Sequence, residues 1–306
     1  ITLQELWRSP PGERAFTLRF SPDGTKLLTV GFWQFGGVLN SWDITNRFEK
    51  RLGPGWEANS FNATISSDAR LVACGGMYGG DVAVVNLKSG ELLAMSGQQD
   101  TIGARVMVHQ FSPDGRILAS ARRDQTVCLW DTRSGALLHR LSWRGAWANA
   151  VAFSPDGNLL AEGGEDARLN LWKVKSGERL FSWICHGGPV QSVAFSPGGN
   201  LLAVGAWDGV VRIFRVSNGR LALAFKPSQK GAVEALAFSP DGKLLVAAIT
   251  GQPYRVHVWS MKQLPLPIPE ERSPNLQSPP IGTSDRLWNR AGIGRVERRP
   301  VRLTRP

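Results

Sequence analysis

A five-residue turn sequence recurs along this chain at nearly constant spacing. Phe-Ser-Pro-Asp-Gly begins at Phe20, Phe111, Phe153 and Phe238, and the variant Phe-Ser-Pro-Gly-Gly begins at Phe195. A degenerate copy, Ile-Ser-Ser-Asp-Ala, begins at Ile65, so successive copies start 42 to 46 residues apart. Such a period indicates an array in which each repeat is one supersecondary unit.

Each repeat predicts four short β-strands. An apolar run such as residues 150–153 leads into Ser-Pro-Asp-Gly, which suits a tight turn because Pro fixes φ at the second position. A second apolar run follows, as at residues 159–161, and a third segment alternates apolar and polar side chains, as at residues 126–130. A later Ser-Gly pair, as at Ser134-Gly135, predicts the turn into the fourth strand.

A four-stranded sheet of this length cannot cover both of its faces alone, and stacking such sheets around an axis supplies the missing cover. The sequence therefore predicts an all-β fold, a β-propeller with six visible four-stranded blades. The alternation and the turn residues exclude a helical solenoid of similar period. The blades are expected at about residues 9–53, 54–96, 97–142, 143–184, 185–226 and 227–262.

The two ends of the repeat region predict how the propeller closes. Residues 2–8 align with residues 138–143, the fourth strand of a later repeat, whereas the last repeat ends after its third strand at Trp259. We expect residues 1–8 to complete the last blade and give six blades within residues 1–262. A seven-bladed ring with one blade upstream of Ile1 is the alternative, since a chain that begins with Ile is expected to be an excerpt. Residues 262–268 are a weaker candidate strand because they contain two prolines and a third follows at Pro269.

Residues 263–306 lack the repeat and are predicted to be a disordered tail. Eight of the 19 prolines lie from Met261 onward, together with an arginine-rich end. The segment has no apolar periodicity with which to build a core. The net charge of the whole chain is +11, so a basic tail or surface would permit contact with nucleic acid or acidic partners.

The repeat resembles the WD-repeat family. The resemblance rests on the Phe-Ser-Pro-Asp-Gly turn and on a closing Trp-Asp, as at Trp42-Asp43 and Trp130-Asp131, and the crisp turn form is most similar to bacterial members. In that family a His, a Ser or Thr, an Asp and a Trp brace each blade. The resemblance implies structural roles for Asp124, Asp166, Asp208, Trp42, Trp130, Trp172 and Trp259.

None of the repeats carries the full bracing set. Ile102 stands at the His position of the third blade, Arg144 and Glu162 replace His and Ser in the fourth, and Val204 and Phe214 replace Ser and Trp in the fifth. Stability is therefore expected to come mainly from apolar packing.

Catalytic motifs are missing from the sequence. The four histidines fall in different repeats, the three cysteines have no metal-ligand spacing, and no paired-carboxylate or nucleophile pattern appears. We expect no enzymatic activity, no cofactor and no bound metal, and a catalytic site in the central channel is the least favoured alternative. No apolar run reaches the length that crosses a bilayer.

The expected loops between strands carry unusually large side chains. In WD-repeat proteins partners usually dock where the connections from the fourth to the first strand and from the second to the third strand meet. Trp and Arg in these loops are the types enriched at binding hot spots. The candidate partner-binding residues are Trp33, Arg122, Arg123, Arg144, Trp147, Glu165, His186 and Trp207. Trp147 and Trp183 are both expected in connections from the fourth to the first strand, and packing between blades is the alternative role of each.

The sequence thus predicts a non-catalytic scaffold that docks a protein or peptide partner, as a monomeric propeller in the cytoplasm. One alternative is that the basic surface and tail bind nucleic acid or acidic partners. A second alternative is that the propeller is the regulatory or sensor module of a larger multidomain enzyme, such as a kinase.

Overall fold

The structure is a computed structural model of the full chain. It describes residues 14–20, 25–33, 36–43, 49–51, 63–75, 82–87, 89, 91–95, 106–142, 147–185, 187–228, 230–251 and 255–262. The chain divides into two compact units, residues 1–276 and 277–306, and all described residues belong to the first. The predicted boundary at residues 262/263 borders undescribed residues, so it stays a prediction.

The described residues form strands and turns only, with 23 strands in six antiparallel sheets. The first two blades contain β1 (Arg14–Phe20), β2 (Lys26–Trp33), β3 (Gly36–Asp43), β4 (Glu49–Arg51), β5 (Ala63–Ile65), β6 (Leu71–Gly75), β7 (Val82–Asn86) and β8 (Leu92–Met95). The third and fourth contain β9 (Val106–Phe111), β10 (Ile117–Arg122), β11 (Thr126–Asp131), β12 (Leu137–Ser142), β13 (Ala148–Phe153), β14 (Leu159–Gly164), β15 (Arg168–Lys173) and β16 (Arg179–Ile184). The fifth and sixth contain β17 (Val190–Phe195), β18 (Leu201–Ala206), β19 (Val211–Arg215), β20 (Leu221–Phe225), β21 (Val233–Phe238), β22 (Leu244–Ile249) and β23 (Arg255–Ser260).

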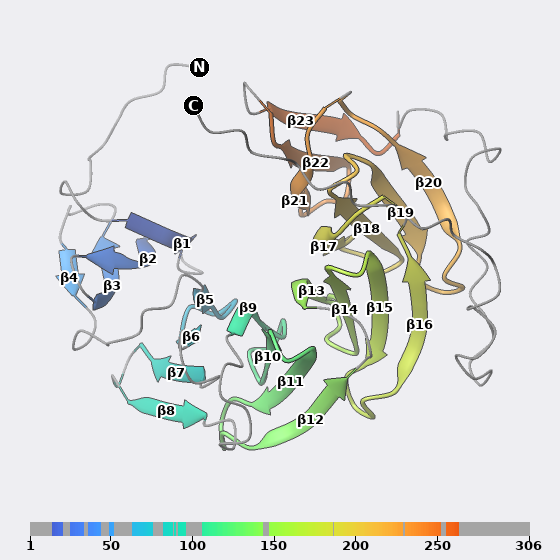
Figure 1. Ribbon diagram of the computed structural model, residues 1–306. Helices are drawn as coiled ribbons and strands as arrows, with labels where there is room; N and C mark the ends of the chain where they lie inside the picture. Colours follow the sequence, from blue (N-terminus) through green and yellow to red (C-terminus); the bar gives the residue numbers. More distant parts are fainter. Residues whose placement is uncertain are drawn as a thin grey trace, which may run out of the picture. The chain divides into compact units, whose positions relative to one another are not determined.

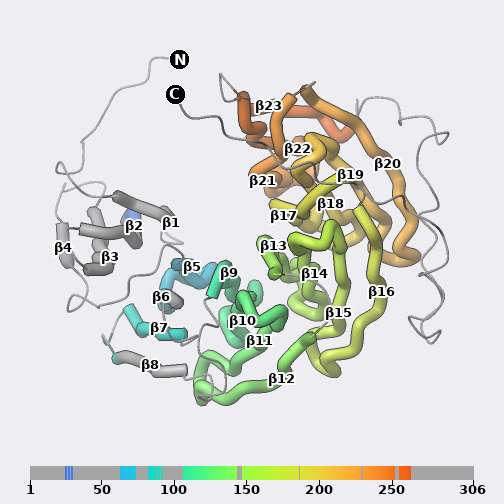
Figure 2. The backbone as a smooth tube through the Cα atoms, in the orientation of Figure 1, coloured from blue at the N-terminus to red at the C-terminus, as the bar shows by residue number. Residues whose placement is uncertain are grey.

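Within each blade the strands pair in chain order, and neighbouring blades meet through their first strands (Figure 1). β9, β13, β17 and β21 are the first strands of four successive blades, and each contacts the next (Figure 2). β5 likewise contacts β9. This succession of four-stranded antiparallel sheets is a β-propeller, as the repeat predicts. The sixth blade has three described strands, and the residues expected to supply its fourth lie outside the described ones.

The Ser-Pro-Asp-Gly turn that joins the first two strands is held by its own side chains. In the third blade the Ser112 hydroxyl donates to Asp114 Oδ1 at 2.6 Å and accepts from the Ile117 amide at 2.9 Å. Asp114 Oδ1 also accepts from the amide of Arg116 at 3.0 Å. Gly115 adopts φ 72°, a left-handed conformation that costs glycine little. Because these bonds join residues close together in the chain, the sequence alone predicts the turn.

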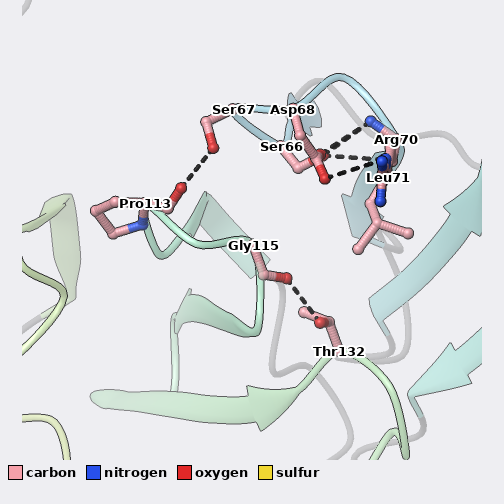
Figure 3. A network of polar contacts seen from close by, with 8 residues as sticks. All are labelled: Ser66, Ser67, Asp68, Arg70, Leu71, Pro113, Gly115 and Thr132. Carbon is pink, nitrogen blue, oxygen red and sulfur yellow. Dashed lines mark hydrogen bonds and ion pairs between the residues drawn. The ribbon is translucent and has the colours of Figure 1, made fainter.

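The same turns link successive blades (Figure 3). The Ser67 hydroxyl of the second blade donates to the Pro113 carbonyl of the third at 2.5 Å. Within the third blade the Thr132 hydroxyl donates to the Gly115 carbonyl at 2.7 Å, which fixes the turn against the end of β11. A Cβ on Gly157 would lie 3.7 Å from Cδ of Pro113, so the turn of the fourth blade packs against that of the third. The recurring turn is therefore a contact between blades as well as a bend within one.

Apolar side chains from facing sheets form the core between blades. Leu129 of β11 is fully buried and packs with Val151 and Leu160 of the next blade. Corresponding clusters join the second blade to the third, the fourth to the fifth and the fifth to the sixth. Burying one aliphatic side chain contributes about 1.5–3 kcal/mol. The expectation of stability from apolar packing accordingly has a structural basis in all four interfaces.

The sixth blade differs because the corresponding face is exposed. Trp259 of β23 is equivalent to Trp130 of β11, because each pairs with the second residue of its neighbouring strand's apolar run. Val256 and Val258 are therefore equivalent to Val127 and Leu129. Their exposed fractions are 70% and 57%, whereas the third-blade residues are fully buried. Among the described residues, no blade packs on this face of the sixth. The predicted closure by residues 1–8 lies outside the described part of the chain and stays a prediction.

Candidate partner-binding face

The side chains of Arg123 and Trp147 come together across two blades. Arg123 begins the turn between β10 and β11, and Trp147 immediately precedes β13. The Arg123 Cζ atom lies 3.9 Å from the centroid of the Trp147 ring. Both residues remain exposed, Trp147 at 37%. A guanidinium at this distance from an indole makes a favourable cation–π contact, so the pair joins the third blade to the fourth at the surface.

Glu165 lies beside Trp147 in the fourth blade, and its partner Asn149 reaches the fifth. The Glu165 amide donates to the Trp147 carbonyl at 2.9 Å, which seats the turn between β14 and β15 beside Trp147. Its carboxylate Oε1 accepts from the Asn149 side-chain amide at 2.8 Å, and the same amide also donates to the Val190 carbonyl at 3.4 Å. Asn149 was not among the sequence candidates, because nothing marks an Asn inside a strand as a ligand of a neighbouring turn.

Trp207 projects from the corresponding turn of the fifth blade. Its side chain is 60% exposed, the most exposed tryptophan described. Its amide donates to the Pro189 carbonyl at 3.0 Å, which places the turn beside the connection into β17. We call the surface formed by Arg123, Trp147, Glu165 and Trp207 the turn face. The contacts above connect its members from the third blade to the fifth by way of Asn149, Pro189 and Val190.

Three aspartates lie under the turn face and hold its turns. Asp124 accepts from the Thr126 amide at 3.1 Å, Asp166 from the Arg168 amide at 3.0 Å and Asp208 from the Val210 amide at 2.9 Å. Each bond joins an aspartate to the amide two residues later, an arrangement that stabilises a tight turn. Each aspartate therefore takes part in a hydrogen bond within its own turn, and its wider structural role stays a prediction.

Asp208 has an additional ionic partner that the sequence did not indicate. Its carboxylate accepts from Arg212 at 3.2 Å and 2.6 Å, and both side chains are largely buried. Arg212 lies on the third strand, two residues before Phe214, which stands at the tryptophan position of the bracing set. A charged residue at that spacing is the only sequence signal that could have found the pair.

Arg122 points away from the turn face into the protein. It is only 2% exposed, and its Cζ lies 5.7 Å from the Trp130 ring centroid. His109 lies opposite Ser120 on the adjacent strand, and burial, together with the charge of Arg122, lowers its pKa to about 3. Arg122 therefore lies beneath the surface on which its neighbour Arg123 is exposed.

The tryptophan bracing differs from blade to blade. In the third blade the Trp130 indole donates to the Ser120 hydroxyl at 2.9 Å, both residues being buried. In the fourth, Glu162 occupies the serine position, and its Oε2 accepts from the Asn170 side chain at 2.7 Å. Burial raises the pKa of Glu162 to about 8, although the bonds from Asn170 and Trp172 oppose that shift. Asp166 likewise has a raised pKa because of burial.

Other predicted residues fall elsewhere. Trp33 ends strand β2 and Trp42 lies in β3, but their side chains are outside the described part, as are Arg144 and His186 entirely. Trp183 lies within β16 and not in the following loop; it is buried, and its indole donates to the Gly219 carbonyl of the next blade at 2.6 Å. Trp259 is half-buried and stacks on His257.

No metal-binding group emerges from the part of the chain that the structure describes. There, no three His, Cys, Asp or Glu side chains gather as ligands. Cys128 and Cys185 are buried free thiols, and burial raises the pKa of Cys185 to about 12. No helix among the described residues has the length and apolar character to span a membrane.

Known proteins share the repeat. A family model described as "WD domain, G-beta repeat" matches residues 89–131, 135–173, 177–215 and 220–260, which together make up more than half of the chain. Each match combines the fourth strand of one blade with the first three strands of the next. The WD repeat-containing protein SL1-17 of Schistosoma mansoni is 30% identical over 124 residues, 40% of this chain. The match covers only 38% of that relative.

Proposed function

Because this chain belongs to the WD-repeat family, whose repeats generally mediate interactions between proteins, we propose that it is a non-catalytic scaffold that docks a protein or peptide partner on the turn face. The observation that carries the proposal is the exposure of Trp207 and Trp147, which are linked through the hydrogen bonds of Asn149 and of the connection into β17. The other tryptophans whose side chains the structure describes, Trp130, Trp172, Trp183 and Trp259, are wholly or partly buried.

A tryptophan side chain exposed to water is unfavourable in free energy and contributes strongly to binding when a partner covers it. Its large apolar area is removed from water when a partner covers it, and its indole N–H can still donate a hydrogen bond. The turn face adds the guanidinium of Arg123 and the carboxylate of Glu165 near the tryptophans. Apolar centres with directional polar groups around them are typical of interaction surfaces.

Binding of nucleic acid through the paired arginines and the tail has less support. Arg122 is buried against Trp130 and cannot reach a phosphate without opening the blade. The basic tail lies outside the described residues, so its role stays a prediction. A nucleic-acid complex would weaken steeply with added salt because bound counterions are released from the phosphates.

The role of the propeller within a larger protein also remains a proposal. A regulatory or sensor module of a multidomain enzyme would use the turn face in the same way, by holding a neighbouring domain or an external partner. We further propose a monomeric propeller in the cytoplasm, as the sequence favours.

The proposal is tested by capture and cross-linking. The full chain and a Trp147→Ala/Trp207→Ala variant are immobilised, and proteins captured from an extract of the source organism are quantified by mass spectrometry. Leu137→Ala/Leu138→Ala, which removes two exposed leucines of β12, is the matched control. A partner should be lost from the tryptophan variant alone, and its cross-links should map to the turn face. Retention of every partner by the tryptophan variant would exclude this surface.

A further inference from the structure

Arg123 is held in place before any partner arrives. Its guanidinium lies 3.9 Å from the Trp147 ring centroid, and the turn that carries it is fixed by Asp124. A free arginine at a surface loses considerable rotamer freedom when it binds a ligand. Stacking on the indole removes part of that freedom in advance, so less is lost when the guanidinium forms hydrogen bonds.

Some other arginines of the described blades already have acidic partners. Arg168 lies 3.7 Å from Asp166, Arg212 bonds Asp208, and Arg116 lies 3.8 Å from Asp114. Within the described ranges no acidic side chain pairs with Arg123, and its guanidinium lies over the face of the Trp147 indole, closer to a ring centroid than that of Arg122 or Arg179. A stacked guanidinium keeps its N–H groups in the plane of the fork, where they remain free to donate.

The chemistry of this group selects its ligand. The planar fork of a guanidinium matches a carboxylate with two parallel N–H···O bonds, which are stronger than bonds between neutral groups. The net charge of +11 favours the approach of an acidic segment. Glu165, seated beside Trp147 and held by Asn149, adds a negative charge that disfavours a run of acidic residues. A single carboxylate among apolar neighbours fits this surface best.

We propose that the turn face recognises a peptide segment carrying one Asp or Glu next to apolar side chains. Its carboxylate pairs with Arg123, and its apolar side chains cover Trp147 and Trp207. This inference rests on the proposed docking function and specifies the chemistry of the partner.

The probe is a random linear peptide library displayed on phage and selected on the full chain. Selected peptides are synthesised with a fluorescent label, and their dissociation constants are measured by anisotropy. Each is also made with its Asp or Glu replaced by Asn or Gln, and with phosphoserine at the same position. The protein variants are Arg123→Ala, Arg123→Lys and Trp207→Ala. Arg116→Ala, which removes the same charge at the opposite end of β10, is the matched control.

The expected result has three parts. Selected peptides share one acidic residue beside apolar ones, and Arg123→Ala weakens them about tenfold or more, as removal of a hot-spot arginine does. Arg123→Lys recovers only part of the loss, because an ammonium keeps the charge but not the fork. Replacement of the peptide carboxylate by its amide costs the same factor in the parent protein and almost nothing in Arg123→Ala. Arg116→Ala binds like the parent.

Other results separate the two levels of the proposal. If Trp207→Ala weakens the peptides but Arg123→Ala does not, the docking face stands and the carboxylate pairing is wrong. Much tighter binding of the phosphoserine peptides would also overturn the assignment to a carboxylate. If neither substitution affects any selected peptide, the docking function itself is wrong. Circular dichroism and thermal unfolding confirm that each variant is folded.

Discussion

Glu162 accepts a hydrogen bond from the side-chain amide of Asn170 at 2.7 Å in the interior of the fourth blade. The equivalent position of the third blade holds Ser120, which accepts from the Trp130 indole, and that of the fifth holds Val204. A carboxyl group thus occupies a place that is a hydroxyl or an isopropyl group in the neighbouring blades. Both Glu162 and Asn170 are fully buried, so this substitution makes the fourth blade sensitive to pH.

Glu162→Gln should gain stability relative to the parent protein as the pH rises. Burial raises the pKa of Glu162 from 4.5 to about 8, so the folded protein keeps a proton that the unfolded chain releases. The parent's free energy of unfolding therefore falls between about pH 4.5 and pH 8, and the glutamine removes that fall. The gain is expected to be on the order of a few kcal/mol at the upper end of this window. Urea unfolding across the window measures it.

Glu165→Gln is the matched control, because it removes an exposed carboxylate three residues away. Its stability difference from the parent should change little with pH. If both variants gain stability equally as the pH rises, the fall in the parent's free energy of unfolding does not come from Glu162.

Ala69→Gly should stabilise the protein. Ala69 stands at the glycine position of the degenerate turn and has φ 56°, in the left-handed region. A side chain in that region costs about 1–2 kcal/mol, part of which glycine recovers after its own loss of backbone entropy. We expect a gain of about 0.5–1 kcal/mol in the free energy of unfolding.

The reciprocal change, Gly115→Ala, should destabilise the protein by a similar amount. A Cβ at Gly115 would meet its nearest atom, Ser66 Cβ, at 3.8 Å, so the cost reports the backbone and not a clash. Denaturant unfolding measures the free energy of unfolding of both variants. A lower value for Ala69→Gly than for the parent would contradict the explanation from the left-handed backbone.

Trp130→Phe should cost about 1–3 kcal/mol, because it leaves the buried Ser120 hydroxyl without its donor. Adding Ser120→Val should recover part of that cost. The double variant reproduces the apolar pair Val204 and Phe214, which the fifth blade accommodates with both side chains buried. Thermal unfolding of the two single variants and the double variant completes a double-mutant cycle. If the losses in the free energy of unfolding simply add, the predicted recovery is wrong.

Deletion of residues 2–8 should expose the edge of β23. If these residues are the fourth strand of the sixth blade, their removal leaves the backbone amides of β23 without partners on that side. Hydrogen exchange across β23 should then accelerate and the free energy of unfolding should fall. Deletion of residues 277–306 is the control and should leave β23 unchanged. Unaltered exchange after the first deletion would instead favour a seven-bladed ring.

Local chemistry explains what sequence reasoning could predict. The hydrogen bonds among Ser112, Asp114, Arg116 and Ile117 join residues at most five apart, so the composition of the turn predicts its structure. The alternation of β11 likewise predicts a strand. The assignment of Trp183 to a loop was wrong because its partners, Phe214 and the Gly219 carbonyl, belong to the next blade. Sequence spacing carries no information about a contact made by a neighbouring blade.

Arg122 and Arg123 show the difference between what the sequence determines and what only the tertiary structure determines. They are identical residues adjacent in sequence, and the sequence alone placed both in the loop between β10 and β11. The tertiary structure buries the first against Trp130 and stacks the second on Trp147 of the following blade. By itself the sequence determined the repeat and the turns, because these depend on interactions within one repeat. It also determined the β-propeller fold, because each repeat forms a sheet that must be covered by its neighbours. Only the tertiary structure decided which side chains reach the surface, because burial depends on what the neighbouring blade places against them.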